Sequence, residues 1–169
     1  MRFDPRGHPM VAIYDHATGE VISTATRIID AIGDHKGMVT HDGTTVGTMI
    51  GRVGELDRQG PDIAIIVEGV TDGLAAVQTW PGGVILAAHS AGQLARVVAE
   101  AAPRLRVIRG WLLIVPDRGD AGVTAGLAAL DDAEAAGLVL DADVHLVDLG
   151  EHQDLTAAVQ AGWTWSWPA

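Results

Sequence analysis

The sequence contains no cysteine. This absence excludes cysteine-based zinc sites such as zinc ribbons and removes every thiol nucleophile. No apolar run reaches the roughly 18 residues that a membrane-spanning helix needs. The first ten residues, MRFDPRGHPM, also lack the apolar stretch of a secretory signal. We therefore expect a cytoplasmic protein without a membrane partner.

Basic residues are scarce. Lysine and arginine number 11 against 22 aspartates and glutamates, so the formal net charge is -11. This argues against a surface that holds duplex nucleic acid by phosphate neutralisation alone, because each contact needs a basic residue. Residues 1–60 carry a net charge of -2 (6 basic, 8 acidic) and residues 61–169 a net charge of -9 (5 basic, 14 acidic). A polyanion site should therefore use the first third of the chain or a metal ion.

Two common catalytic motifs are missing. No glycine-rich segment carries the lysine of a phosphate-binding P-loop, so an ATPase or helicase motor is not encoded in this chain. The seven histidines show neither HxxxH nor HExxH spacing, which disfavours a histidine-built zinc site. His89 follows an expected strand, where a hydrogen-bonded structural role is favoured over catalysis.

The composition is that of a globular domain. At 169 residues, with 48% hydrophobic and 20% charged residues, the chain is long enough for one well-buried core. The first 60 residues predict a β-rich segment that begins with a hairpin, MVAIYD and VISTATRII, with Gly19 in its turn. Near Gly60-Pro61 the sequence pattern changes from short β-segments to strands that alternate with helices. This change predicts a division into residues 1–60 and 61–169.

The second part alternates apolar strands with helices. Strands that are apolar on both faces and alternate with helices predict an α/β fold. We expect a central, mainly parallel sheet of about four strands flanked by helices. The expected strands are residues 62–69, 82–88, 110–116 and 143–149, and the expected helices are residues 71–80, 91–102 and 121–138.

Acidic residues follow these strands. Glu68 ends an apolar strand, where burial of a charge is unfavourable without a partner, and Asp72 comes four residues later. Asp117, Asp120 and Asp148 follow two later strands. Ligands bind at the carboxyl ends of parallel strands, and Mg²⁺ favours carboxylates. The pattern predicts a metal site, although Asp72 and Asp120 would serve equally well as helix N-caps.

Three segments, in order, resemble the Toprim domain: IAIIVEGVTDGLAAVQTW, VILAAHSAGQLA and LLIVPDRGDAGVTAGLAAL. Toprim is the metal-dependent catalytic module of bacterial-type primases, type IA and II topoisomerases and some nucleases. The likeness is closest to primases of phages, plasmids and other mobile elements, and it extends from Tyr14 to Trp163. It implies a Rossmann-like Toprim fold preceded by the small β-rich segment. The topoisomerase alternative is set aside, because the only tyrosine lies in the predicted first hairpin.

The resemblance implies roles for several residues that follow the predicted strands. Glu68 matches the family's acid/base residue, which acts on a 3′-hydroxyl or a leaving oxygen. It would also be a metal ligand. Asp117 and Asp120 would hold Mg²⁺ or Mn²⁺. Gly69 and Asp72 would lie against the nucleotide or DNA.

One position departs from the family pattern. The two aspartates of the family are usually separated by one residue, and counting back from Gly122 places the second at position 119, where this sequence has glycine. The conformational freedom of Gly119 would let the turn bend until Asp120 faces the metal. The alternative is weak metal binding and loss of full activity.

The resemblance also implies partners. A primase domain uses single-stranded DNA and NTPs and works with a helicase or another replication domain. Arg27, Lys36 and Arg52, from the less acidic first third, are candidates to contact phosphates, although each alone is more typical of a solvated surface charge.

Two further functions stay open. A Toprim nuclease would use the same acidic cluster to cut phosphodiesters. A docking module would have lost the site at Gly119 and would use the alternating tryptophans of WTWSWP as an interface.

Overall fold

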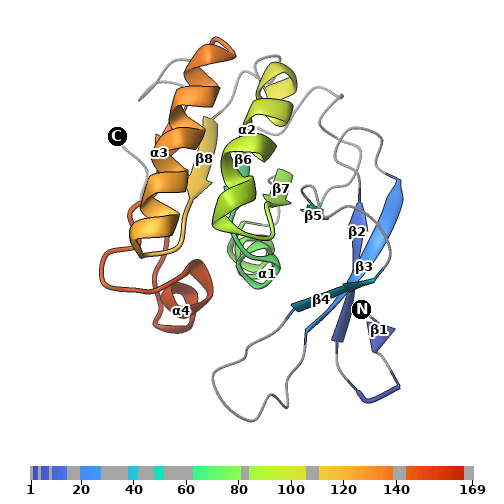
Figure 1. Ribbon diagram of the computed structural model, residues 1–169. Helices are drawn as coiled ribbons and strands as arrows, with labels where there is room; N and C mark the ends of the chain where they lie inside the picture. The colour runs from blue at the N-terminus through green and yellow to red at the C-terminus, as the bar shows by residue number, and fades with distance from the viewer. Residues whose placement is uncertain are drawn as a thin grey trace.

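The computed structural model describes residues 2–3, 5–7, 9–14, 20–27, 38–41, 48–51, 63–80, 84–105, 111–138 and 144–165. These residues form two sheets and four helices. The smaller sheet lies beside the edge of the larger one (Figure 1).

The smaller sheet is antiparallel and comes from the N-terminal part of the chain. Its strands are β1 (Arg2–Phe3), β2 (Pro9–Tyr14), β3 (Val21–Arg27) and β4 (Met38–His41), paired in that order. The pairing of β2 with β3 confirms the predicted hairpin. Gly19, the expected turn residue, lies outside the described residues.

The larger sheet has the strand order β5-β7-β6-β8-β9. β6 (Ile63–Val67), β7 (Val84–Ala87), β8 (Trp111–Val115) and β9 (Val144–Leu146) pair in parallel, which confirms the four predicted strands. β5 (Thr48–Gly51) pairs antiparallel with β7 at one edge. Strand pairing thus crosses the division expected after residue 60, and that division remains a prediction.

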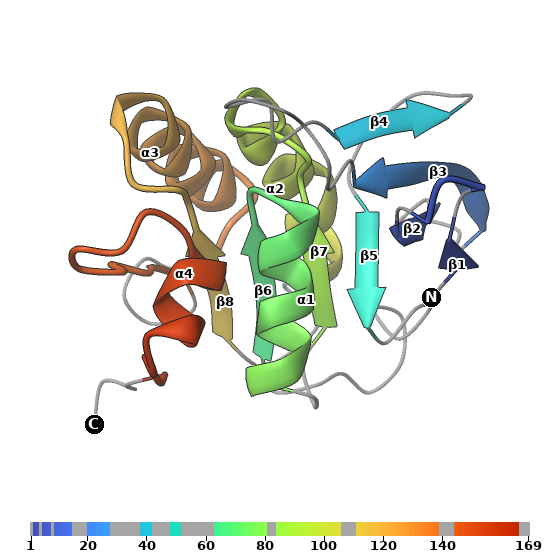
Figure 2. The ribbon, with the colours of Figure 1, turned by 90° about the horizontal axis from the view of Figure 1, so that it is seen from below.

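Helices cover both faces of the larger sheet. α2 (Ala91–Leu105) and α3 (Asp120–Ala135) lie on one face, while α1 (Val70–Thr79) and α4 (Leu155–Gln160) lie on the other (Figure 2). All five residues of β6 are buried, because side chains on both faces of a central strand meet helices. Among the described helices, none combines the length and apolar character needed to cross a membrane.

The larger sheet has one hydrophobic core on each face, and successive side chains of a strand point into the two cores alternately. Ala64 and Ile66 of β6 pack with α2 and α3, whereas Ile65 and Val67 pack with α1 and α4. Helix α3 lies close to the sheet at Gly126, where an added Cβ would be 2.9 Å from Leu146 Cδ1 and 3.0 Å from Pro116 Cγ. This close packing brings the first turn of α3 to the carboxyl end of β8.

Two of the alternating tryptophans, Trp163 and Trp165, belong to the core on the α1 and α4 side of the sheet. Trp163 and Trp165 pack against the α1 and α4 side, with their rings 4.9 Å apart in an edge-on arrangement. Trp165 Nε1 donates to Thr79 Oγ1 at 2.9 Å. Residues 163–165 are not a strand, so the alternation in the sequence reflects core packing here and not a flat stacking surface.

Strand register places the functional candidates at one edge. Val67 lies beside Ala87 of β7 and Val115 of β8, so β6, β7 and β8 end at the same level. The residues that follow these strands therefore meet at the carboxyl edge of the sheet, as the parallel arrangement predicts.

Candidate active site

Glu68 and Asp117 lie next to each other at this edge. Glu68 follows β6 directly, and Asp117 follows β8 after Pro116. The backbone N–H of Asp117 donates a long hydrogen bond of 3.4 Å to Glu68 Oε2. The predicted proximity of these two residues is confirmed, while their roles in chemistry remain a prediction.

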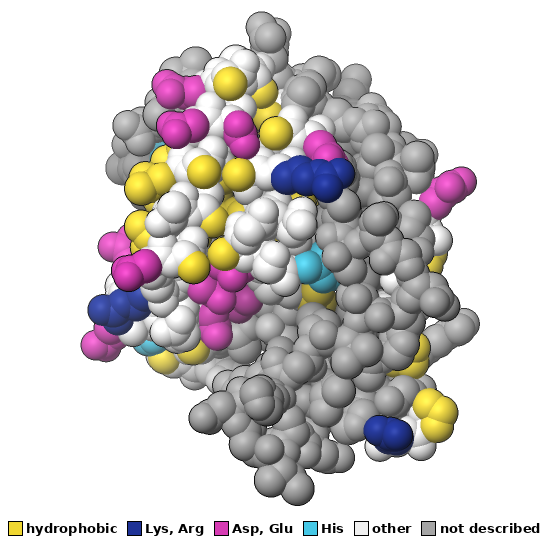
Figure 3. Space-filling model, in the orientation of Figure 1, with side chains coloured by type: hydrophobic (Ala, Val, Ile, Leu, Met, Phe, Trp, Pro, Cys, Tyr) yellow, Lys and Arg dark blue, Asp and Glu magenta, His cyan; other side chains and the backbone are white. Residues whose placement is uncertain are grey.

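The pKa of Asp117 reports on the surroundings of its carboxyl group. Burial, the largest cause, contributes to raising this pKa to about 7. The other causes are the neighbouring carboxylates of Glu68, Asp72 and Asp154. Three neighbouring carboxylates thus repel the charged form of Asp117. Figure 3 shows that acidic side chains gather on the surface below α2 and α3. A cation at this place would relieve the repulsion.

Asp72 is the most buried of the four, with a relative exposure of 5%. Its Oδ1 accepts from the backbone N–H of Thr156 at 2.9 Å and from Thr156 Oγ1 at 2.7 Å. Burial still raises the pKa of Asp72 above its ordinary value, although these hydrogen bonds act in the opposite direction. Asp72 therefore joins α1 to the start of α4.

Gly69 makes room for this buried carboxylate. A Cβ at residue 69 would lie 2.5 Å from Asp72 Oδ2. Gly69 is also the N-cap residue of α1, and no side chain caps that helix. The N-cap alternative for Asp72 is therefore wrong, because Asp72 is the third residue of the helix. Contact of Gly69 and Asp72 with a nucleotide remains a prediction.

The N-cap alternative for Asp120 is also wrong. Asp120 is the first residue of α3 and is exposed, and the N-cap residue is Gly119, without a side-chain hydrogen bond. Gly119 has φ 165 and ψ 161, an extended conformation open to any residue, and space for a Cβ is free. The special freedom of glycine is thus not used in this turn. Asp120 is not among the charges that raise the pKa of Asp117, and its metal-binding role remains a prediction.

Gly122 has a steric role beside the site. A Cβ at this position would collide with the backbone carbonyl of Asp117. Because only glycine permits this approach, the first turn of α3 packs directly on the Asp117 backbone. This contact gives a physical reason for the glycine that trails the aspartates.

Asp154 is the acidic residue that sequence reasoning did not place at the site. It is the N-cap residue of α4, where its Oδ1 accepts from the backbone N–H of Ala157 at 2.7 Å. Its charge also raises the pKa values of Asp117 and Asp72. An aspartate directly before a short amphipathic segment is a capping signal, but its distance of 37 residues from Asp117 concealed the second role.

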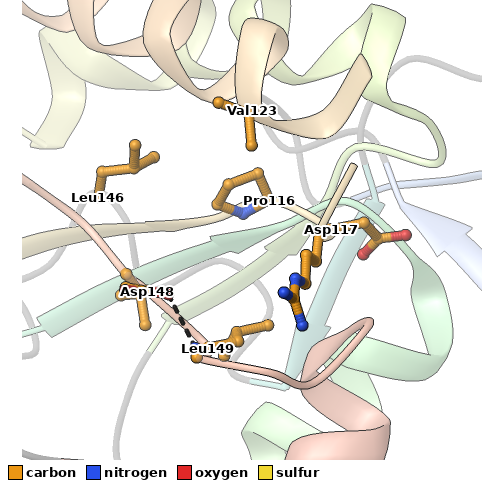
Figure 4. Close-up of a pocket in the computed structure, with 9 residues that line it drawn as sticks. Pro116, Asp117, Val123, Leu146, Asp148 and Leu149 are labelled. Atoms are coloured by element: carbon orange, nitrogen blue, oxygen red, sulfur yellow. Dashed lines mark hydrogen bonds between the residues drawn. The ribbon is translucent and has the colours of Figure 1, made fainter. Parts of the chain in front are cut away.

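Asp148 and the adjoining pocket lie to one side of the cluster. A pocket of about 190 Å³ has mainly apolar walls that include Pro116, Val123 and Leu146. Asp148 is exposed, and its Oδ1 accepts from the Gly150 backbone N–H at 2.8 Å. In Figure 4 the Asp117 carboxylate points away from the side chains of Leu146 and Asp148. Asp117 lines this pocket too, but Asp148 is not among the charges that raise the pKa of Asp117.

His89 follows β7 at the same carboxyl edge. Its φ is 74, in the left-handed region, and among the residues that the structure describes no other non-glycine residue has a positive φ. Burial lowers the pKa of His89 below its ordinary value, so the neutral imidazole is favoured.

The basic candidates lie mostly beyond the described parts of the chain. Arg27 is the last residue of β3 in the smaller sheet. Lys36 and Arg52 lie outside the described residues. Their contact with phosphates remains a prediction.

The donor chemistry of the cluster fits a hard divalent cation. Glu68 and Asp117 offer carboxylate oxygens, the ligands that Mg²⁺ and Mn²⁺ prefer. Across the described ranges, however, no three histidine, aspartate or glutamate side chains are arranged to hold a metal ion together. The residues fit the ion in type, and a bound ion would have to draw them closer.

The fold and these acidic strand ends define the class of protein that the chain resembles. No protein-family model and no curated protein matches the sequence. Among solved structures, the chain matches the primase fragment of the bacteriophage T7 primase-helicase protein with a TM-score of 0.64 and 16% identity. The match covers 90% of this chain and 57% of that one.

Bacterial primases match as well. A DNA primase domain from Pseudomonas aeruginosa has a TM-score of 0.62 and 21% identity, over 90% of this chain and 46% of that chain. The zinc-binding and RNA polymerase domains of the Aquifex aeolicus primase have a TM-score of 0.66 and 21% identity, over 91% and 37%. The chain thus spans about half the length of these structures. At such identities the likeness shows the fold, which is the Toprim fold found in DNA primases, as the sequence resemblance implied.

Proposed function

We propose that the chain is the Toprim catalytic part of a DNA primase, which makes RNA primers on single-stranded DNA with Mg²⁺ or Mn²⁺. The observation that carries the proposal is the meeting of Glu68 and Asp117 at the carboxyl edge of a primase-like sheet. The charges of Asp72 and Asp154 act on the same carboxyl group.

We assign different roles to Glu68, Asp117 and Asp72 according to their surroundings. Glu68, half-buried at the end of β6, is the group to take a proton from a 3′-hydroxyl or to return one to a leaving oxygen. Asp117 would hold the metal, because its charged form is disfavoured until a cation is present. The metal would stabilise negative charge that develops on phosphate oxygens. Asp72 would keep α1 and α4 in place beneath the nucleotide.

We further propose a setting in the replication of a phage or another mobile element. The motifs resemble primases of that group, and one structural neighbour is the primase fragment of a phage primase-helicase protein. Because this chain has no P-loop, unwinding would come from a helicase or another replication domain outside it. Arg27, Lys36 and Arg52 would contact the phosphates of the DNA template or of NTPs.

Incubation with single-stranded DNA, labelled NTPs and Mg²⁺ or Mn²⁺ tests the proposal. Template-dependent RNA products are expected from the natural sequence and not from Glu68→Gln or Asp117→Asn. Asp131→Asn is the matched control, because Asp131 is an exposed aspartate in the second half of α3, away from the carboxyl ends of the strands. Cleavage of labelled DNA without synthesis would support the Toprim nuclease instead.

A docking module is the remaining candidate. It is favoured by one observation, the lack of a carboxylate at Gly119 in a turn with open space for one. A natural sequence that neither binds Mn²⁺ nor reacts with any NTP or polynucleotide would support docking and contradict both catalytic functions.

A further inference from the structure

Two loops meet through reciprocal hydrogen bonds beside the acidic cluster. The Arg118 backbone N–H donates to the Gln153 carbonyl at 2.7 Å, and Gln153 Nε2 donates to the Arg118 carbonyl at 2.8 Å. A third bond of 2.6 Å runs from Arg118 Nη1 to the Glu151 carbonyl. The turn after β8 is therefore fastened to the residues before α4.

The loop that contains Gln153 interacts with two of the acidic residues of the site. We name residues 151–156 the approach segment, since they lead into α4 and include its first two residues. Its Asp154 acts electrostatically on Asp117, and its Thr156 holds the Asp72 carboxylate. The position of this segment therefore affects three of the four carboxylates.

Gln153 and its hydrogen-bond partner Arg118 are each next in sequence to one of these acids. Arg118 is adjacent to Asp117, and Gln153 is adjacent to Asp154. Fastening Arg118 to Gln153 therefore limits how far the Asp117 and Asp154 carboxylates can separate. These like charges repel each other, and the repulsion favours separation of the loops when no cation lies between them.

The Gln153 side chain contributes to this fastening without contributing to the core. Gln153 is exposed, and its amide contacts the Arg118 backbone and not a buried group. Replacing it would remove one of the three bonds and leave the two whose acceptors are backbone carbonyls of the approach segment. An effect on the site can therefore be measured separately from an effect on folding.

We propose that Gln153 is a positioning residue that holds Asp117 near Asp154 and so raises the affinity of the site for a divalent cation. This inference rests on the proposed function, because it assigns the cluster to metal binding. The side chain acts through the Arg118 backbone and does not touch the reacting atoms.

Titration calorimetry with Mn²⁺ tests the proposal on the full chain. Gln153→Leu is expected to weaken Mn²⁺ binding by about two- to tenfold, the range that corresponds to one ordinary hydrogen bond. The matched control is Gln160→Leu, at an exposed glutamine in the last turn of α4. Both variants are expected to melt at similar temperatures. Equal Mn²⁺ affinity in the two variants would overturn the proposal and leave the proposed function intact.

A double-mutant cycle tests whether Gln153 acts through the spacing of the two acids. Asp154→Asn removes the charge and keeps a residue that caps α4 well. In that background Gln153→Leu is expected to change Mn²⁺ affinity by less than about twofold, because the repulsion is gone. The same fold loss in both backgrounds would contradict action through Asp154.

Hydrogen exchange provides a readout that needs no metal. The Arg118 amide is expected to exchange faster in Gln153→Leu than in Gln160→Leu. If the natural sequence bound no Mn²⁺, the proposed function would fail. The fastening role would then stand or fall on this exchange rate alone.

Discussion

The turns after β6 and β8 are built alike, but they present their acidic residues differently. Each enters a helix through a glycine N-cap, Gly69 for α1 and Gly119 for α3, without a side-chain cap. The third residue of α1 is Asp72, buried and bonded to Thr156. The third residue of α3 is Gly122, which lies on the Asp117 carbonyl.

This difference shows how one helical position decides where a carboxylate points. In α1 the third residue turns inward and supplies an acid. In α3 the equivalent place has no room for a side chain. The turn after β8 therefore contributes only its strand-end acid, Asp117, to the cluster, whereas the turn after β6 contributes both Glu68 and Asp72. Asp120, at the first position of α3, remains exposed. Substitutions in the two turns should therefore differ in their effect on the free energy of unfolding.

Gly122→Ala should be the most damaging substitution. Its methyl group would overlap a backbone carbonyl that cannot rotate away, so we expect a loss of roughly 2–3 kcal/mol, at the upper end for overpacking. Urea unfolding of this variant measures the loss. Gly119→Ala is the control, because it has open space and an extended backbone, and we expect it to match or slightly exceed the natural stability. Equal stability of the two variants would contradict the assigned packing.

Asp72→Ala should be the next largest. It leaves the Thr156 N–H without its acceptor in a part-buried place, at a cost of about 1–3 kcal/mol. Asp72→Asn retains an acceptor oxygen and should be much less damaging. Asp120→Ala, at an exposed position, should change stability by no more than about 0.5 kcal/mol. Thermal melts of the three variants would contradict the comparison if Asp120→Ala were the least stable.

Asp117→Asn should stabilise the metal-free protein at neutral and higher pH. The folded pKa of about 7 exceeds the ordinary value of 3.8, so the natural protein loses stability as pH rises through this interval. The asparagine variant avoids this loss, with a gain of about 1–2 kcal/mol above pH 7 after allowance for solvent screening. Below pH 3.8 the gain should vanish. Denaturation in EDTA across this pH range measures it, and a gain independent of pH would rule out the electrostatic cause.

Gly119→Asp should have the smallest effect on stability, within about 0.5 kcal/mol, because the backbone is extended and the space is open. It should nevertheless strengthen Mn²⁺ binding and any nucleotidyl transfer, since it supplies the carboxylate expected from the family pattern. Asp120→Ala in the natural sequence should remove activity if Asp120 is a ligand. Calorimetry with unchanged affinity in both variants would exclude this turn from the metal site beyond Asp117.

The sequence by itself determined the layers of the main sheet and the place of its two central acids. Strands such as Ile63–Val67 are apolar on both faces, and this pattern is possible only where helices cover both sides. Parallel strands end at one edge, so Glu68 and Asp117 were expected at the same edge once the strands were recognised, and the direct pairing of β6 with β8 in the structure brings them next to each other. These features depend on local periodicity, which a single sequence displays directly.

Only the tertiary structure decided which further groups join the site. Asp72 meets Thr156 across 84 residues, Asp154 acts on Asp117, and β5 pairs with β7 at the sheet edge. The direction of a side chain in the first turn of a helix changes with each residue, so capping and inward-facing aspartates look alike in sequence. Their orientation depends on contacts between distant segments, and those contacts form only when the chain has folded.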